Sequence, residues 1–160
     1  CIGIDPFYLA EYAKKLKVKP NIILAGRLTN ENEVTHLYND IKNHYKNLSI
    51  SSRVLVLGCT FKENCPDTRN SKVLDLIYKL QKNKIKVDVF DNWVTYEDKK
   101  FLDLNFLENI PIKEDYFYIL IAVKHNTFKN LTLKKVRNIT INKNCKINDY
   151  KNILNWILFL

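Results

Sequence analysis

The side chains most able to do chemistry in this sequence are its thiols and the basic groups of one polar loop. Cysteine occurs at four positions (Cys1, Cys59, Cys65 and Cys145). No two of them have the Cys-x-x-Cys spacing of zinc and redox sites, and only three histidines accompany them, so no metal site is expected. Nothing indicates an oxidising compartment, and we therefore expect free thiols in a cytoplasmic protein.

The polar loop follows an apolar run at residues 53–58 and contains Lys62 and Arg69. In open parallel α/β sheets, ligands bind at the carboxyl ends of the strands, which is where this loop would lie. A lysine there suits a diphosphate or a sugar hydroxyl, and the planar arginine suits a pyrophosphate. No glycine follows Gly58, so the Gly-x-Gly-x-x-Gly fingerprint of dinucleotide sites is absent.

From residue 53 onward, strands and helices are expected to alternate. Apolar, β-rich runs predict strands at residues 53–58, 85–91 and 116–123, with a short last strand at 145–150. Helices are expected after Ser71, over residues 96–102 and over residues 127–136. This alternation predicts an α/β fold, a Rossmann-like parallel sheet with helices on both faces.

Two helices are expected before the sheet. Asp5 suits the N-cap of the first, with Pro6 in its first turn. Thr29 suits the N-cap of a second helix over residues 30–47, while residues 22–26 are ambiguous between a helix and a connector. Its apolar stripe needs a partner domain or subunit, and residues 48–52 are the expected linker. We expect domains at 1–48 and 52–152, followed by a tail at 153–160.

Composition narrows the class of protein. Hydrophobic residues make up 46% and charged residues 27% of the chain, which is typical of a globular protein. The apolar runs are far shorter than the roughly 20 residues of a membrane span, and no signal peptide is recognisable. The net charge of +9 is spread along the chain without a nucleic-acid-binding motif, so neither a membrane nor a nucleic-acid partner is expected. A chain that lacks Met and starts at Cys1 is expected to be a fragment rather than a lipoprotein.

Four segments together resemble one enzyme family. Residues 57–71 (Leu-Gly-Cys-Thr-Phe-Lys-Glu-Asn-Cys-Pro-Asp-Thr-Arg-Asn-Ser) resemble the C-terminal-domain signature of the UDP-glucose/GDP-mannose dehydrogenase family. Residues 1–9 (Cys-Ile-Gly-Ile-Asp-Pro-Phe-Tyr-Leu) are similar to its catalytic segment, and residues 24–27 with Asn30 to the start of its dimerisation helix. Residues 121–128 (Ile-Ala-Val-Lys-His-Asn-Thr-Phe) resemble a strand-end motif of its N-acetylhexosamine branch. The segments run in family order and spacing.

The resemblance implies an NAD-dependent nucleotide-sugar 6-dehydrogenase, with a helical dimerisation region before a UDP-sugar-binding domain. Such enzymes oxidise a primary alcohol twice and hold the intermediate aldehyde on a cysteine thiolate. Cys1 matches that nucleophile, and Asp5 matches a carboxylate that positions or activates water. Phe61 and Lys62 match residues that contact the UDP-sugar, and Arg69 matches an arginine that reaches NAD. A homodimer is implied.

Several alternatives stay open. Asp5 could serve only as an N-cap, Arg69 could pair with Asp67, and His125 is better read as a satisfied strand-end histidine than as an acid or base. The substrate implied is a UDP-N-acetylhexosamine, with UDP-glucose or UDP-N-acetylmannosamine as alternatives. The family's N-terminal NAD-binding domain is missing from this chain, so a non-catalytic nucleotide-sugar-binding module is the competing reading.

Overall fold

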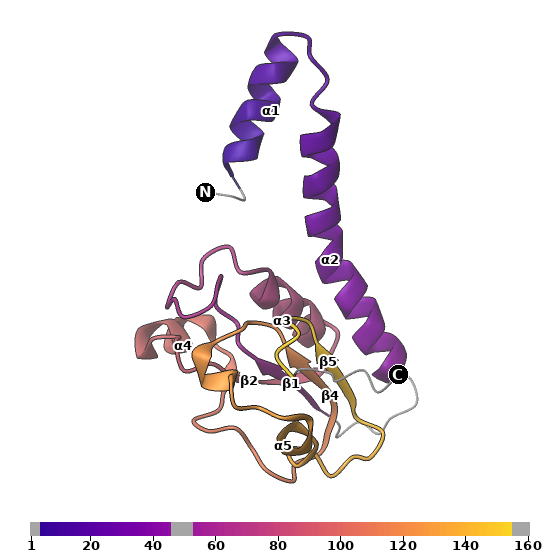
Figure 1. Ribbon diagram of the computed structural model, residues 1–160, viewed down its shortest axis with the longest axis vertical. Helices are drawn as coiled ribbons and strands as arrows, with labels where there is room; N and C mark the ends of the chain where they lie inside the picture. Colours follow the sequence, from indigo (N-terminus) through magenta and orange to yellow (C-terminus); the bar gives the residue numbers. More distant parts are fainter. Residues whose placement is uncertain (1–3, 46–52, 155–160) are drawn as a thin grey trace. The chain divides into compact units, whose positions relative to one another are not determined.

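The computed structural model of the chain describes residues 4–45 and 53–154 (Figure 1). The chain divides within one long helix into two compact units, the first ending at Leu37 and the second beginning at Tyr38. The expected boundary at residues 48–52 falls outside the described residues, so the division into domains 1–48 and 52–152 stays a prediction. The elements are α1 (Asp5–Lys15), α2 (Asn21–Tyr45), β1 (Arg53–Leu57), α3 (Lys72–Lys82), β2 (Lys86–Phe90), α4 (Tyr96–Leu102), β3 (Asn105–Phe106), β4 (Tyr116–Ile121), η1 (Asn126–Phe128), α5 (Leu133–Arg137) and β5 (Lys146–Asp149).

The first helix starts one residue earlier than expected. Its N-cap is Ile4, which makes no side-chain capping bond, and Asp5 lies inside the first turn ahead of Pro6. The expected capping role of Asp5 is therefore wrong. Proline needs no hydrogen-bond partner in this turn because it lacks an N–H, and the helix dipole still favours the carboxylate of Asp5 there.

The second helix is continuous from Asn21 to Tyr45, so the expectation that Thr29 caps its start is wrong. The hydroxyl of Thr29 instead donates to the carbonyl of Ala25, 3.0 Å away. This back-bond to the preceding turn lets a threonine stay in a helix interior. The helix starts directly after Pro20, and the segment 22–26, which was ambiguous in sequence, is helical.

The second unit contains a five-stranded sheet in the order β3-β2-β1-β4-β5, and every pair of neighbours is parallel. This confirms the Rossmann-like α/β class. The two-residue strand β3 was not expected, because it is too short for a periodic pattern. The helix expected over 127–136 is broken into η1 and α5, and the hydroxyl of Thr132 caps the start of α5 by accepting from the amide of Lys135.

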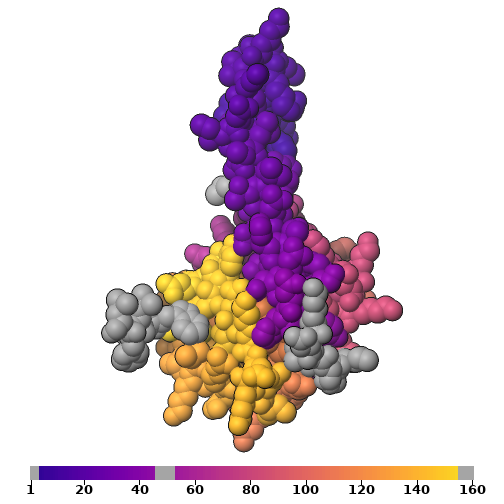
Figure 2. Space-filling view, turned by 90° about the vertical axis from the view of Figure 1, so that its right-hand side faces the viewer, coloured from indigo at the N-terminus to yellow at the C-terminus, as the bar shows by residue number. Residues whose placement is uncertain are grey.

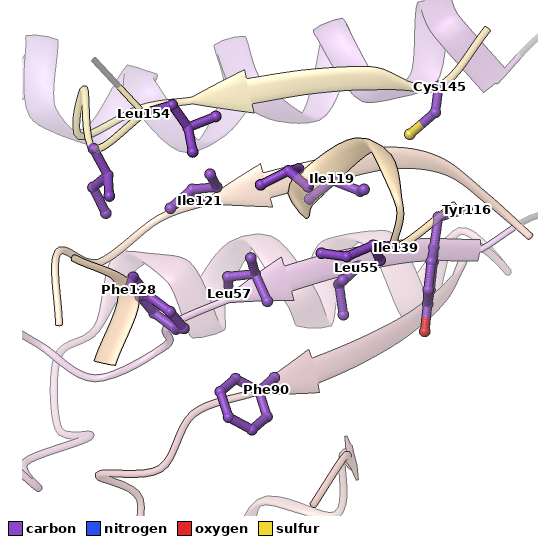
Figure 3. Packing of buried hydrophobic residues seen from close by; sticks show 12 residues of the cluster. Leu55, Leu57, Phe90, Tyr116, Ile119, Ile121, Phe128, Ile139, Cys145 and Leu154 are labelled. Carbon is purple, nitrogen blue, oxygen red and sulfur yellow. The ribbon is translucent and has the colours of Figure 1, made fainter. Parts of the chain in front are cut away.

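The sheet is covered on both faces, as expected for the central strands β1 and β4, which are apolar and buried along nearly their whole length. On one face, the core side chains lie between the strands and the η1–α5 segment (Figure 3). They are Leu55, Leu57, Phe90, Tyr116, Ile119, Ile121, Phe128, Val136, Ile139, Cys145, Ile153 and Leu154. On the other face α3 buries four apolar side chains. Ile153 and Leu154 thus belong to the core and not only to the expected tail.

The last turns of α2 belong to this second unit, and they lie against its C-terminal part (Figure 2). A polar cluster links them to the sheet. The hydroxyl of Tyr118 in β4 donates to Asp40 at 2.6 Å, and Lys146 in β5 pairs with the same carboxylate at 2.6 Å. Burial and the neighbouring carboxylate raise the pKa of Tyr118 well above its usual value, so the phenol stays protonated as a donor. Ile41 is fully buried beside this cluster.

Candidate functional site

The strand order makes the carboxyl ends of β1 and β4 the place where a ligand is expected to bind. The chain leaves β1 toward β2 on one side, and it later crosses to form β4 on the other side. At such a reversal, the loops after the two central strands diverge and leave room for a ligand at their carboxyl ends. The loop at residues 59–71 follows β1, and the segment at residues 122–128 follows β4.

Gly58, directly after β1, lies against the backbone and side chain of Val123, just beyond the end of β4. Its φ is +84°, and a Cβ placed on it would lie 2.7 Å from the Cβ of Val123. Its amide also donates to the carbonyl of Phe90 at the end of β2. The one glycine of this turn is therefore required by packing between strands rather than by the close approach of a pyrophosphate.

The loop after β1 is closed by its own hydrogen bonds. The amide of Phe61 donates to the carbonyl of Asp67 at 2.8 Å, and the hydroxyl of Ser71 donates to the carbonyl of Cys59 at 2.7 Å. Ser71 is the N-cap residue of α3, as expected, yet its hydroxyl holds the loop and makes no capping bond. The loop is therefore a compact turn that begins and ends at the edge of the sheet.

Three residues expected to bind ligand are brought together on the outside of this loop. Phe61 is 45% exposed, Lys62 is exposed, and the side chain of Arg69 is 85% exposed. Arg69 makes a two-pronged ion pair with Asp67, with distances of 2.9 and 2.8 Å, and this pair lowers the pKa of Asp67 to about 2. The alternative role of Arg69 as a loop brace is thus present in the structure, while most of its guanidinium still faces solvent.

The hub of the site is Asp91, a residue to which the sequence assigned no role. One oxygen of this carboxylate accepts the amides of Cys59 (2.7 Å) and Thr60 (3.2 Å), and the other accepts the amide of Trp93 (2.8 Å). Burial by itself would raise the pKa of Asp91. The hydrogen bonds from His125 and from the backbone amides outweigh burial, and the net pKa lies below its usual value.

His125, at the end of the β4 segment, is completely buried and fully hydrogen-bonded, which confirms the reading of a satisfied strand-end histidine. Its Nδ1 accepts the amide of Asn64 at 3.0 Å. Its Nε2 lies 3.1 Å from the carboxylate of Asp91 and 3.2 Å from the hydroxyl of Thr60. The ring also stacks on Trp93, with centroids 6.2 Å apart.

The two expected catalytic residues precede the unit that contains the sheet in the sequence. Cys1 is outside the described residues, and Asp5 is exposed in the first turn of α1, in the other compact unit. Cys59 is buried, and burial raises the pKa of its thiol far above the usual range, which disfavours the reactive thiolate form. Across residues 4–45 and 53–154, no three His, Cys, Asp or Glu side chains gather in a metal-binding group. Within the same ranges, none of the helices has the length and apolar character that crossing a membrane demands.

Asp91 and Asn64 are the residues that sequence reasoning missed. Asp91 is the polar residue that directly follows an apolar strand, which was an available signal. The bonds it makes go to backbone amides, and an amide has no signature in the sequence. Asn64 has a left-handed φ of +54°. Asparagine tolerates this conformation better than most residues, so the residue type itself was the available signal for a turn.

Comparison with known proteins gives a consistent result. Residues 55–156 match the UDP binding domain of the UDP-glucose/GDP-mannose dehydrogenase family. The chain is 39% identical over 142 residues to a UDP-N-acetyl-D-glucosamine 6-dehydrogenase of Pseudomonas aeruginosa, covering 87% of this chain and 34% of the relative. It is 35% identical over 160 residues to the protein CapL of Staphylococcus aureus, covering 97% and 37%.

Solved structures agree in fold. The native structure of a UDP-N-acetyl-mannosamine dehydrogenase from Staphylococcus aureus superposes with a TM-score of 0.66 at 28% identity, over 84% of this chain and 30% of that one. A UDP-glucose dehydrogenase from Pyrobaculum islandicum gives a TM-score of 0.74 at 18% identity, over 93% and 36%, which shows the fold alone.

The chain spans about a third of the length of the curated relatives that it matches. The matched segment covers the sheet, apart from the first two residues of β1, and the loop at its carboxyl edge. On this evidence the chain belongs to the UDP-glucose/GDP-mannose dehydrogenase family, of which it carries the UDP-binding domain.

Proposed function

We propose that this chain is the C-terminal part of an NAD-dependent UDP-sugar 6-dehydrogenase, and that the substrate is a UDP-N-acetylhexosamine oxidised to its uronic acid. The observation that carries the proposal is the hydrogen-bonded loop at residues 59–71, which presents Phe61, Lys62 and Arg69 at the switch point of the sheet. It is supported by relatives named as UDP-N-acetyl-D-glucosamine 6-dehydrogenases.

The loop residues are proposed to hold the nucleotide sugar. The ammonium of Lys62 would pair with a diphosphate or a sugar oxygen, and a charge-assisted bond of this kind contributes about 1.5–3 kcal/mol. The half-exposed ring of Phe61 gives an apolar surface beside it. Because the loop is already closed by its own hydrogen bonds, little conformational entropy remains to be lost on binding.

Cys1 and Asp5 are proposed to carry the covalent chemistry. The thiolate of Cys1 would add to the aldehyde carbon to form a thiohemiacetal, which is oxidised to a thioester. Water would then attack the thioester carbonyl, release the acid and restore the thiol. Asp5 would hold or deprotonate that water.

The described residues do not by themselves form a cradle for NAD. The turn after β1 has a single glycine, and it is filled by its contact with Val123. The exposed guanidinium of Arg69 fits one pyrophosphate contact. When bound, NAD supplies the hydride acceptor for both oxidations. We propose that parts of the full protein outside this chain hold most of it.

The proposed homodimer is supported by apolar side chains that α1 and α2 leave exposed. They include Tyr8, Leu9, Tyr12, Ile22 and Leu28, at 58–89% exposure. Such side chains are expected to be covered by a partner in the assembled enzyme. A second copy of the chain is the proposed partner, and the proposed location is the cytoplasm.

The test is NADH formation by the full reading frame offered UDP-N-acetylglucosamine, UDP-N-acetylgalactosamine and UDP-glucose in turn, beside a Cys1→Ser variant. Turnover with an N-acetylated sugar that the variant cannot complete is expected. Lys62→Ala should raise the KM for the sugar by about tenfold or more. Lys86→Ala is the matched control, because Lys86 is also exposed but lies at the opposite end of the sheet. Turnover with UDP-glucose but with neither N-acetylated sugar would show that the proposed substrate is wrong and that UDP-glucose is the substrate.

A non-catalytic nucleotide-sugar-binding module is the second candidate, and it rests on the match of residues 55–156 to a UDP binding domain. It predicts that the chain binds UDP by calorimetry, while a folded full reading frame forms no NADH with any of the three sugars. Turnover would exclude this candidate.

A further inference from the structure

The ring of His125 lies inside the turn formed by residues 60–64 and touches both ends of it. The amide of Asn64 can only donate, so Nδ1 of His125 must present a lone pair at their 3.0 Å contact. The ring proton is therefore on Nε2, which lies 3.1 Å from the carboxylate of Asp91 and 3.2 Å from the hydroxyl of Thr60. One buried ring thus bridges the two ends of the turn.

Each end of the turn has a second attachment. At its start, Asp91 accepts the amides of Cys59 and Thr60. At its end, the side-chain oxygen of Asn64 accepts the amide of Asn126 at 2.9 Å. Only residues 61–63 lie between these attachments, and all three are exposed. Their position is consequently set by groups that lie beneath them.

We infer that His125 is a positioning residue for nucleotide-sugar binding: through its Nδ1 it fixes the amide of Asn64 and so holds Phe61 and Lys62 where the ligand meets them. This inference rests on the proposed function, and it gives His125 a part in nucleotide-sugar binding without direct contact with the ligand. A turn held in its bound conformation binds more tightly than a loose one, because less ordering is left to be done on binding.

Two substitutions separate the roles of the two ring nitrogens, Nδ1 and Nε2. His125→Asn keeps an acceptor near the position of Nδ1, but it loses the donor to Asp91 and leaves more empty volume. His125→Gln reaches the position of Nε2, but it has no acceptor for the amide of Asn64. If His125 only filled space, His125→Asn would be the more damaging change, because asparagine is the smaller residue.

The experiment measures UDP affinity by calorimetry and amide hydrogen exchange at Asn64 in the full 160-residue chain, with the free energy of unfolding measured alongside. We expect His125→Gln to weaken UDP binding by about tenfold and to expose the Asn64 amide to exchange, with His125→Asn within about threefold of the parent. An Asn64 amide that stays protected in His125→Gln would overturn the inference, as would a greater loss of affinity in His125→Asn.

A milder variant tests the same turn without touching the core. Asn64→Gly tolerates the left-handed φ and removes only the bond to Asn126, and it is expected to weaken UDP binding by about threefold or more. Asn152→Gly is the matched control, because Asn152 also has a left-handed φ, of +50°, and lies after β5. Equal UDP affinity in the two glycine variants would contradict the argument that the bond from Asn126 helps to hold the end of the turn, whereas the bond between the residue-64 amide and His125 is kept in Asn64→Gly.

Failure of the proposed function has a different signature. If the parent chain did not bind UDP, the UDP-binding role of the loop would be wrong, whereas the exchange of the Asn64 amide would still decide whether His125 orders the turn. Normal UDP binding with an unchanged turn in His125→Gln would overturn the positioning role and leave the proposed function intact.

Discussion

Substituting Gly58 by alanine should destabilise this domain, because neither the backbone conformation of Gly58 nor the space around it suits a Cβ. The backbone of Gly58 has a φ of +84°, which an L-residue adopts at a cost of about 1–2 kcal/mol. The new Cβ would lie 2.7 Å from the Cβ of Val123, a separation that Cβ atoms essentially never show in proteins, and it would lie 3.1 Å from the amide nitrogen of Val123, which is also tight.

The strands must move apart to relieve that contact, and overpacking of this kind costs about 1–3 kcal/mol. Together the two effects give a loss of about 2–5 kcal/mol in the free energy of unfolding, against a total of about 5–15 kcal/mol for a typical domain. Urea denaturation followed by tryptophan fluorescence measures it, and the midpoint should fall by about 1–3 M.

The same substitution at Gly26 is the control, because it should have the opposite sign. Gly26 lies inside α2, and a Cβ there would have no neighbour within 4 Å. Alanine in a helix interior is favoured over glycine by about 0.5–1 kcal/mol, so Gly26→Ala should raise the thermal stability of the helix in far-UV circular dichroism. A Gly58→Ala variant as stable as the parent chain would refute the argument from close packing.

Three further predictions concern buried polar groups. The pKa of Asp91 is lower in the folded chain than in the unfolded chain, so its contribution to stability is present above the unfolded value and is lost as the pH falls through the folded one. Urea midpoints measured from about pH 5 to about pH 3 should therefore fall less steeply in Asp91→Asn, and an unchanged slope would contradict this. Tyr118→Phe removes the bond to Asp40 and should lower the free energy of unfolding by about 1–2 kcal/mol in chemical denaturation. A free energy of unfolding equal to that of the parent chain would show that the bond contributes nothing. Iodoacetamide should label the partly exposed Cys65 in the native chain and Cys59 only after denaturation, as read by peptide mass spectrometry; labelling of native Cys59 would show that its burial is transient.

The central strands could be predicted from sequence because burial on both faces makes them continuous apolar runs. β1, β2 and β4 each lie within a predicted range. The start of α2 could not be predicted, because Thr29 is a good N-cap residue and is equally able to bond to the turn before it. The position of β3 could not be predicted either, since two residues carry no period.

The candidate site was only partly predictable, because some of its contacts join segments that are far apart in the sequence. Phe61, Lys62 and Arg69 stand in a contiguous motif, so sequence alone brought them together. The Asp91 carboxylate acts on the backbone amides of residues more than thirty positions away, and that partnership depends on which strands lie side by side. The prediction that His125 is a hydrogen-bonded strand-end histidine was confirmed. The same hydrogen bonds, which involve no ligand, join His125 to the turn at residues 60–64.

The position of β5 has a consequence for the order in which the domain is made. β4 is a six-residue strand of Tyr, Phe, Ile and Leu without a charge, and every side chain in it is buried. Its partner β5 is synthesised more than twenty residues later, so the nascent chain carries one open edge of β4 meanwhile. Uncharged segments of this kind self-associate when their edges are free. Translation that stalls between β4 and β5 is thus expected to yield aggregated rather than partly folded protein.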